Sequence, residues 1–287
     1  MFKQAFGAAF AAAGLLLAVA PAAQAADAAL QAAVAGDQRS EAHKARDAAR
    51  HPVETLTFWG LKPKLTVVEL QPGSGYWTEI LAPYAKATGG TYVATAADLD
   101  NPNLPEAAKK NREAFEARYA DEARFGKISY VNFGAQSKTL GAPGSADMII
   151  TARNIHNWMW TEGQLDRILK QAHDVLKPGG VLAVEEHRAD PRPEAVNAEG
   201  RKAYDGYVST ATVIAAAEKA GFKLAAQSEV NANPKDTKDH PFGVWTLPPT
   251  RQSSAKAGEP SPEGFDRAKY DAIGESDRMT LRFVKQG

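Results

Sequence analysis

The chain of 287 residues contains no cysteine, which excludes disulfide bonds, thiolate metal ligands and cysteine nucleophiles. It also lacks an excess of charge of one sign, because 34 lysines and arginines balance 34 aspartates and glutamates. No long basic run interrupts this balance. A protein that binds a phosphate backbone gathers lysine and arginine on one surface. We therefore expect no nucleic-acid partner.

Long apolar runs are also scarce, and the one that exists lies at the N-terminus. Lys3 supplies a positive charge, residues 8–20 are mostly apolar, and Ala23-Gln24-Ala25 has the small-x-small pattern of a cleavage site. The run is shorter than the roughly 20 residues of a membrane span and is followed by Pro21. We predict a signal peptide over 1–25, a mature protein that begins near Ala26 in the periplasm or the medium, and no stable membrane anchor.

The rest of the chain has the composition of one large globular domain, with 44% hydrophobic residues. The alanine-rich segment 26–50 predicts a helical N-terminal extension. From residue 51 to residue 287, apolar runs alternate with helix-like segments, which is typical of an α/β fold with helices on both faces of a parallel sheet. The predicted strands are 65–70, 91–96, 128–133, 148–151, 181–185, 222–229 and 279–284.

Three local signals add detail to this pattern. Thr161 and Gln164 predict a capping box at the start of an amphipathic helix. The Lys-Pro-Gly-Gly sequence at 177–180 predicts the turn that ends this helix before the strand 181–185. The long, proline-rich connection 231–277 predicts a lid or an insertion.

The first predicted strand runs directly into a glycine-containing turn, Pro72-Gly73-Ser74-Gly75. Ligands of open α/β sheets bind at the carboxyl ends of the strands. Gly73 and Gly75 would let the backbone approach a ligand closely, and the next helix would offer its amino-terminal NH groups to a carboxylate.

Three segments, taken together, resemble class I S-adenosylmethionine-dependent methyltransferases. They are VVELQPGSGYWTEILAPY at 67–84, ADMIITARNIHNW at 146–158 and VLKPGGVLAVEEHR at 175–188. The most similar branch is a group of exported bacterial "predicted methyltransferases" of unassigned substrate, which Arg50-His51-Pro52 and Ser276-Asp277-Arg278 also fit. The resemblance covers residue 50 to the C-terminus. It implies a Rossmann-like methyltransferase sheet of seven mostly parallel strands, S-adenosylmethionine as cofactor, and a small molecule or an exported protein as methyl acceptor.

The resemblance also implies the cofactor-binding residues. It assigns the methionine part of the cofactor to Gly73, Ser74 and Gly75. Glu69 stands at the family's acidic position, suited to the cofactor's amino group or to an NH of the turn. Asn154 follows the fourth strand at the same edge of the sheet, and we expect it near the cofactor as well.

The sequence departs from the family pattern at two places. Gln71, followed by Pro72, replaces a common glycine and makes the turn stiffer. Ala96 and Ala97 replace the acid that binds the ribose hydroxyls, so that Asp98 or, next in line, Asp100 must substitute for it. An NAD-binding Rossmann site is a minor alternative, because 73–78 lacks the third glycine and the ribose-binding acid is missing for NAD as well.

His156 and His187 are the candidate general bases, since both follow strands at the carboxyl edge. Methyl transfer needs alignment of the acceptor and removal of a proton, which a neutral histidine performs near pH 7. Glu186 or Glu185 would orient the base. Each histidine is also a candidate for a structural, hydrogen-bonded residue. We expect His187 to be the base, because its Glu-Glu-His setting supplies possible orienting carboxylates, whereas for His156 the two roles stand equal.

Two other interpretations remain open. His156, His187, Glu186 and His240 are suitable zinc or copper ligands, but their spacing gives no support, and we predict no metal. The main alternative is a non-catalytic binding protein that keeps the methyltransferase fold. We predict that the protein is exported, whereas synthesis of the cofactor requires ATP and is expected inside the cell.

Export generates the first prediction. N-terminal sequencing of protein from the periplasm or medium of the producing bacterium should return a start at or near Ala26. Recovery of intact Met1 from a cytoplasmic pool would contradict the predicted signal peptide.

Overall fold

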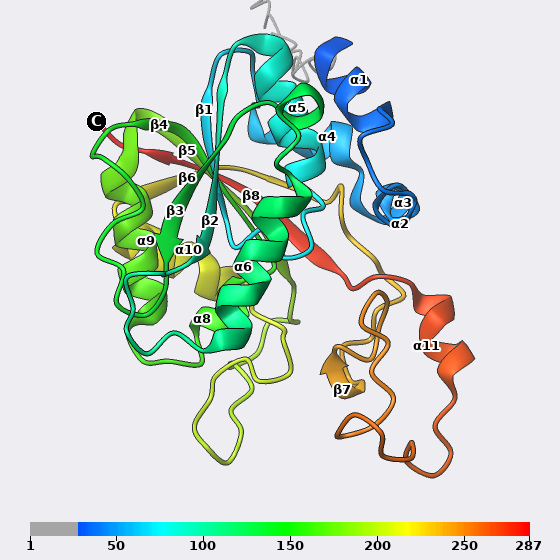
Figure 1. Ribbon diagram of the computed structural model, residues 1–287. Coiled ribbons are helices and arrows are strands. Elements are labelled where there is room, and N and C mark those ends of the chain that lie inside the picture. Colours follow the sequence, from blue (N-terminus) through cyan, green and yellow to red (C-terminus); the bar gives the residue numbers. More distant parts are fainter. Residues whose placement is uncertain (1–27) are drawn as a thin grey trace, which may run out of the picture.

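The computed structural model describes residues 28–287, which form one seven-stranded sheet flanked by helices (Figure 1). The predicted signal peptide over 1–25 and the predicted start at Ala26 lie outside the described residues. The strands of the sheet are β1 (Thr66–Leu70), β2 (Thr91–Ala97), β3 (Ile128–Phe133), β4 (Ala146–Ala152), β5 (Leu176–His187), β6 (Phe222–Ser228) and β8 (Arg278–Lys285).

The strand order is β3-β2-β1-β4-β5-β8-β6. In this sheet β8 runs antiparallel to β5 and β6, and the other neighbouring pairs are parallel. The predicted Rossmann-like α/β sheet of seven mostly parallel strands is confirmed. Because β8 is reversed, its first residues lie at the same edge as the carboxyl ends of β1, β4 and β5.

Helices pack against both faces of the sheet. They are α1 (Ala28–Ala35), α2 (Glu41–Lys44), α3 (Asp47–Arg50), α4 (Pro52–Trp59), α5 (Thr78–Thr88), α6 (Glu106–Arg118), α7 (Glu122–Phe125), α8 (Ile155–Trp158), α9 (Gln164–Val175), α10 (Thr210–Lys219) and α11 (Arg267–Ile273). Successive strand residues point to opposite faces. Val67 of β1 therefore packs in a core with α1, α4, α5 and α7, whereas Val68 packs in a second core with α8, α9 and α10.

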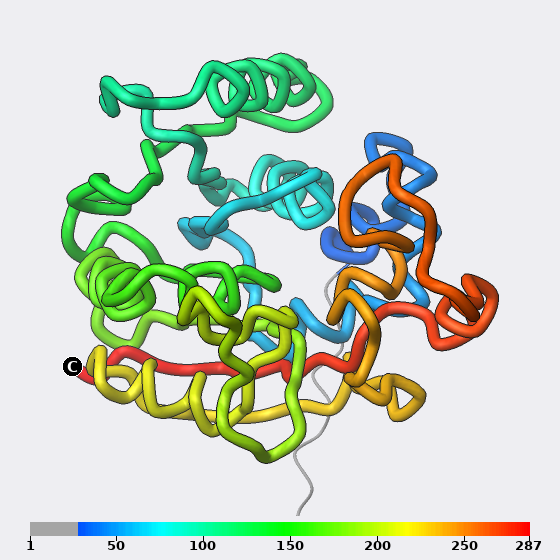
Figure 2. The backbone as a smooth tube through the Cα atoms, turned by 90° about the horizontal axis from the view of Figure 1, so that it is seen from below, coloured from blue at the N-terminus to red at the C-terminus, as the bar shows by residue number. Residues whose placement is uncertain are grey.

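The N-terminal extension is helical, as predicted, and consists of α1, α2 and α3. It lies on the same side of the molecule as the connection 231–277, which holds the short strand β7 (Pro241–Val244) and α11 (Figures 1 and 2). The two segments are tied by ion pairs from Arg46 and Arg50 to Glu275, at 2.6 and 3.0 Å. Since Glu275 just precedes β8, these pairs lie at the ligand-binding edge of the sheet.

Two local expectations are wrong. The capping box is not formed, because the residue before α9 is Gly163 in the left-handed region (φ 71°), and Thr161 contributes only its carbonyl oxygen, 3.2 Å from Gln164 N. The Lys-Pro-Gly-Gly sequence does not separate α9 from its strand either. β5 already pairs with β4 at Leu176, and the segment bulges out before pairing resumes at Val181.

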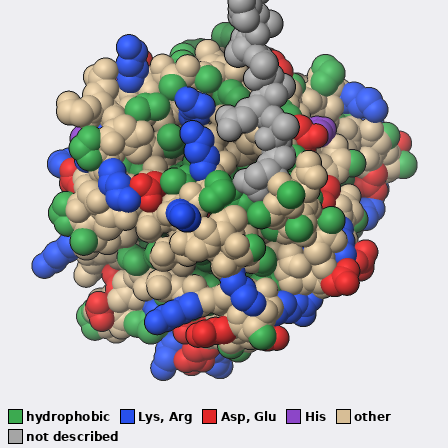
Figure 3. All heavy atoms as spheres, turned by 90° about the horizontal axis from the view of Figure 1, so that it is seen from above, with side chains coloured by type: hydrophobic (Ala, Val, Ile, Leu, Met, Phe, Trp, Pro, Cys, Tyr) green, Lys and Arg blue, Asp and Glu red, His purple; other side chains and the backbone are tan. Residues whose placement is uncertain are grey.

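The surface carries charges of both signs, and the helices are short. On the face shown in Figure 3, basic and acidic side chains are interspersed over the molecule. Within residues 28–287, no helix combines the length and the apolar character that a membrane span requires.

Candidate functional site

The turn after β1 is held in an unusual backbone conformation. Gln71 has a φ of 47°, in the left-handed region that favours glycine, and Gly73 and Gly75 follow with φ of 60° and 92°. Gln71 N donates to Thr95 Oγ1 at 2.7 Å, and the Trp158 indole NH donates to Gln71 Oε1. These two bonds hold a glutamine where the resemblance led us to expect glycine.

Two cavities meet at this turn. The first, which we call the histidine cavity, has a volume of about 230 Å³ and is lined by the turn, Arg153, His156, His187 and Ser276. The second, the Asp98 cavity, has a volume of about 520 Å³ and lies along β2, next to Ala97, Asp98 and Phe133. Both cavities are lined by Gln71, Pro72, Gly73 and Asn154. A long ligand could therefore span β1 with one end in each cavity.

Glu69 lines the histidine cavity from β1. Its Oε2 accepts hydrogen bonds from the hydroxyls of Thr78, at 3.1 Å, and Tyr92. Burial raises the pKa of this carboxyl to about 7, although both hydroxyl bonds act in the opposite direction. Glu69 thus lies where a bound ammonium group would favour its charged form.

The three residues of the turn differ in what they face. Gly73 lines both cavities, and a Cβ built on it would meet no atom within 4 Å. Ser74 also lines the histidine cavity, and its Oγ lies 3.2 Å from Nε2 of His43, in α2. A Cβ on Gly75 would lie only 1.9 Å from the Tyr119 hydroxyl oxygen. We expected a side chain at Gly75 to meet the ligand, and this is wrong, because a Cβ there would point toward Tyr119 inside the protein.

Asp98 lies at the position where a ribose-binding acid is needed. It is buried, its Oδ2 accepts from Ser137 Oγ at 2.7 Å, and its Oδ1 accepts from Asp100 N at 3.1 Å. Asp100 itself accepts from Asn132 Nδ2 at 2.9 Å. Asp98 therefore lines the cavity with both oxygens already engaged within the protein.

Asn154 links the ends of two strands. Its Nδ2 donates to the carbonyl of Leu70, the last residue of β1, at 2.9 Å. Asn154 itself follows β4 by two residues and lines both cavities, so it lies at the junction where the two cavities meet.

His156 and Glu186 form a buried pair. His156 Nδ1 lies 2.9 Å from Glu186 Oε1, which also accepts from His187 N at 2.8 Å. Glu186 Oε2 accepts from the backbone NH groups of Ile155, at 2.6 Å, and His156, at 3.2 Å. The carboxylate thus binds the first NH groups of α8 and orients the His156 ring at the same time.

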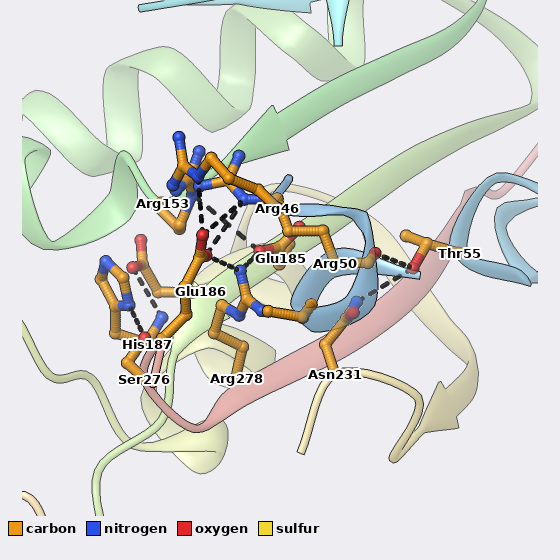
Figure 4. A network of polar contacts seen from close by, with 12 residues as sticks. Arg46, Arg50, Thr55, Arg153, Glu185, Glu186, His187, Asn231, Ser276 and Arg278 are labelled. Carbon is orange, nitrogen blue, oxygen red and sulfur yellow. Dashed lines mark hydrogen bonds and ion pairs between the residues drawn. The ribbon is translucent and has the colours of Figure 1, made fainter. Parts of the chain in front are cut away.

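His187 has a different partner from the one expected. Its Nδ1 lies 2.5 Å from Ser276 Oγ, and its ring centre lies 5.3 Å from that of His156 (Figure 4). Burial lowers the pKa of His187 well below its usual range, and the charges of His156, Arg153 and Arg278 act in the same direction. The orienting carboxylate belongs to His156, since Glu186 and His187 are neighbours on β5 whose side chains leave the strand in opposite directions.

Glu185 orients neither histidine. Its Oε1 lies 2.9 Å from Arg278 Nη1 and 3.9 Å from Arg153 Nε (Figure 4). Arg278 Nη1 also lies 3.0 Å from Glu275 Oε2. These residues form a buried ionic cluster under the histidine cavity.

A metal could be held only by displacing existing bonds. Ligand atoms of His156, Glu186 and His187 lie within 4.8 Å of one another. Both oxygens of Glu186, however, already accept hydrogen bonds from NH groups. His240 is engaged elsewhere, with Nε2 at 2.8 Å from Asp236 Oδ1.

Several cavity residues were not singled out from the sequence. Arg153, Glu275 and Ser276 line the histidine cavity, and Trp245, Pro248 and Pro249 line it from the connection 231–277. The sequence held one signal, because the Ser276-Asp277-Arg278 segment fits the methyltransferase branch although no role could be assigned to it.

Comparisons with known proteins agree with this fold. Residues 68–184 match the family model described as "Methyltransferase domain". No curated protein matches the chain. Among solved structures, the [4+2]-cyclase SpnF has a TM-score of 0.51 at 13% identity, covering 88% of this chain and 85% of its own. A candidate sarcosine dimethylglycine methyltransferase from Galdieria sulphuraria has a TM-score of 0.51 at 14% identity, covering 87% and 89%.

The burial of Glu69 generates the second prediction. The unfolded chain releases this proton near pH 4.5 and the folded protein only near pH 7, so ionisation of Glu69 destabilises the fold as pH rises between these values. From pH 4.5 to pH 8, wild type should lose about 3 kcal/mol more of its free energy of unfolding than Glu69→Gln, at about 1.36 kcal/mol per pKa unit. Urea unfolding at both pH values measures the difference, and parallel pH dependences would contradict it.

The seven-stranded sheet with its reversed β8, the cavities at the carboxyl edge and the family match lead to one conclusion: the protein has the Rossmann-like methyltransferase fold, and its residues 68–184 match the model of a methyltransferase domain.

Proposed function

We propose that the protein transfers the methyl group of S-adenosylmethionine to an acceptor bound in the histidine cavity. The observation that carries this proposal is the meeting of the two cavities at Gln71, Pro72, Gly73 and Asn154. The larger Asp98 cavity fits the adenosyl part of the cofactor. Glu69 and the open side of Gly73 fit its methionine part. The bound cofactor would supply a methyl group on a sulfonium sulfur, ready for in-line displacement by the acceptor.

His156 is the proposed general base. Because Glu186 accepts the proton on Nδ1, the lone pair of His156 lies on Nε2, and the ring lines the cavity. Nε2 can then remove a proton from an acceptor hydroxyl or ammonium group. The carboxylate stabilises the imidazolium that forms, by the same logic as the carboxylate of a catalytic triad.

His187 is proposed as a positioning residue. Its lowered pKa keeps the imidazole neutral and makes it a weaker proton acceptor than an ordinary histidine. Its contact with Ser276 ties the end of β5 to the start of β8. This proposal differs from the expectation from the sequence, which favoured His187 as the base because Glu185 and Glu186 precede it.

A binding protein without methyltransferase activity is the second candidate. Ala96 and Ala97 offer no acid to the ribose, and both oxygens of Asp98 accept hydrogen bonds from within the protein. A ligand would have to displace or share these bonds, which would weaken cofactor binding.

We also propose that the acceptor is a small molecule or another exported protein. The N-terminal sequence supports export, and the small histidine cavity, about 230 Å³, supports a small acceptor or a single side chain.

The third prediction separates the two histidines. His156→Gln should reduce methyl transfer by about 10²- to 10⁴-fold and leave S-adenosylhomocysteine affinity within a few-fold, because only proton removal is lost. His187→Gln, the matched variant, should reduce transfer by less than about tenfold. Transfer of labelled methyl groups from S-adenosylmethionine into an extract of the producing bacterium measures both. Equal losses, or a loss confined to His187→Gln, would contradict the assignment, and a wild-type loss on chelation that zinc restores would assign a metal instead.

A further inference from the structure

Arg153 is a partly buried cation whose Nε lacks a hydrogen-bonding partner. It follows β4 directly, and its φ of 62° places a non-glycine residue in the left-handed region. Its Nε is buried and makes no hydrogen bond, while the side chain as a whole is 22% exposed. The ion pair from Arg153 to Glu185 is 3.9 Å long, which is beyond hydrogen-bond distance.

Glu185 and Glu275 lie closer to other arginines than to Arg153, although neither oxygen of Glu185 makes a hydrogen bond. Glu185 is 2.9 Å from Arg278, and Glu275 is within 3.0 Å of Arg46, Arg50 and Arg278. Glu186 is held by His156 and backbone NH groups. The ion pairs of Glu185 and Glu275 involve four arginines, Arg46, Arg50, Arg153 and Arg278, so that positive charge is in excess there; Figure 4 labels these four arginines and Glu185.

Arg153 presents part of this excess positive charge to the histidine cavity. Arg153 lines the histidine cavity, its side chain is 22% exposed, and Arg46 and Arg278 act on it electrostatically. A guanidinium whose buried Nε makes no hydrogen bond gains from a partner that supplies one. Its planar fork suits two oxygens of a carboxylate or phosphate.

The position of Arg153 distinguishes the acceptor from the cofactor. Its ion-pair partner Glu185 is on β5, whereas the glycine turn follows β1, on the other side of β4 in the sheet order. The Asp98 cavity lies further away along β2. Arg153 therefore faces the part of the histidine cavity that is lined by His187 and Ser276.

We propose that Arg153 binds an oxyanion, a carboxylate or a phosphate, of the methyl acceptor. The acceptor is thus an anionic molecule whose charged group is anchored at Arg153 while its nucleophilic atom lies near His156. The identification of the anion as the methyl acceptor rests on the proposed function. The anion site at Arg153 does not depend on it.

The test uses three probes of similar shape on purified protein, with and without S-adenosylhomocysteine. They are benzoate, phenyl phosphate and the neutral benzamide, whose rings match the aromatic side chains of Tyr76, Trp77 and Trp245 in the cavity wall. We expect at least one anion to bind at least tenfold more tightly than benzamide in calorimetric titrations. Whichever anion binds more tightly identifies the oxyanion. Failure of both anions to bind more tightly than benzamide would overturn the proposal.

The variant Arg153→Met identifies the residue. It should weaken binding of the anion by about 10- to 100-fold, the loss expected for charge-assisted hydrogen bonds, and leave benzamide unaffected. Arg192→Met is the matched control, because Arg192 pairs with Asp205 and does not line the cavity. Its binding should equal that of wild type. Unchanged anion binding in Arg153→Met would overturn the proposal.

Two further readouts cover the other roles of Arg153. If Arg153→Met weakens S-adenosylhomocysteine but not 5′-methylthioadenosine, which lacks the amino-acid part, then Arg153 holds the cofactor's carboxylate and the acceptor assignment is wrong. Because Arg278 still pairs with Glu185 in Arg153→Met, this variant should keep the melting temperature of wild type or raise it, whereas a clear drop would show a structural cation. If S-adenosylhomocysteine does not bind wild type, the proposed function fails, while the anion titrations of the protein alone still decide the Arg153 site.

Discussion

The Glu186 carboxylate is the interaction on which the site depends. It accepts three backbone NH groups and the His156 ring, and so joins the end of β5 to the loop after β4. A carboxylate buried this deeply is tolerated because hydrogen bonds surround its charge. In turn, α8 presents His156 to the cavity, and Trp158 of the same helix donates to Gln71 in the turn after β1. One buried group thereby links the acceptor side of the site to its cofactor side.

The strands and the glycine turn could be predicted because their signals are local. Apolar runs mark β1, β4 and β5, and Gly73 marks the turn. The Glu186 to His156 pairing could not be predicted, because Glu185, Glu186 and His187 are adjacent in sequence and only the strand geometry decides which face each side chain takes. The ionic cluster was equally hidden, since Arg46, Arg153 and Glu275 are distant in sequence and meet only in the folded chain. Local capping signals were also misleading: Thr161, the predicted cap, does not cap α9, whereas Ser209, which was not singled out from the sequence, caps α10 through its hydroxyl.

The fold alone does not determine which reaction the protein catalyses, because one fold supports many activities. The [4+2]-cyclase SpnF, with a TM-score of 0.51, has a similar fold. The argument for methyl transfer therefore rests on the site: Glu69 beside the turn, the two joined cavities, and a histidine oriented by a carboxylate. Glu275, from the connection 231–277, lines the histidine cavity and is held by ion pairs to Arg46 and Arg50 of the N-terminal extension. Residues outside the family match therefore contribute to the site.

Calorimetric titration of S-adenosylhomocysteine into wild type and Gly73→Asn tests the central claim most directly. Gly73 lines both cavities, a Cβ added to it would meet no protein atom within 4 Å, and asparagine tolerates the left-handed backbone there. We predict saturable binding of one ligand per chain to wild type, and a loss of at least about tenfold in affinity in Gly73→Asn, with both proteins folded. No binding to wild type, or equal affinity in the two proteins, would contradict the account.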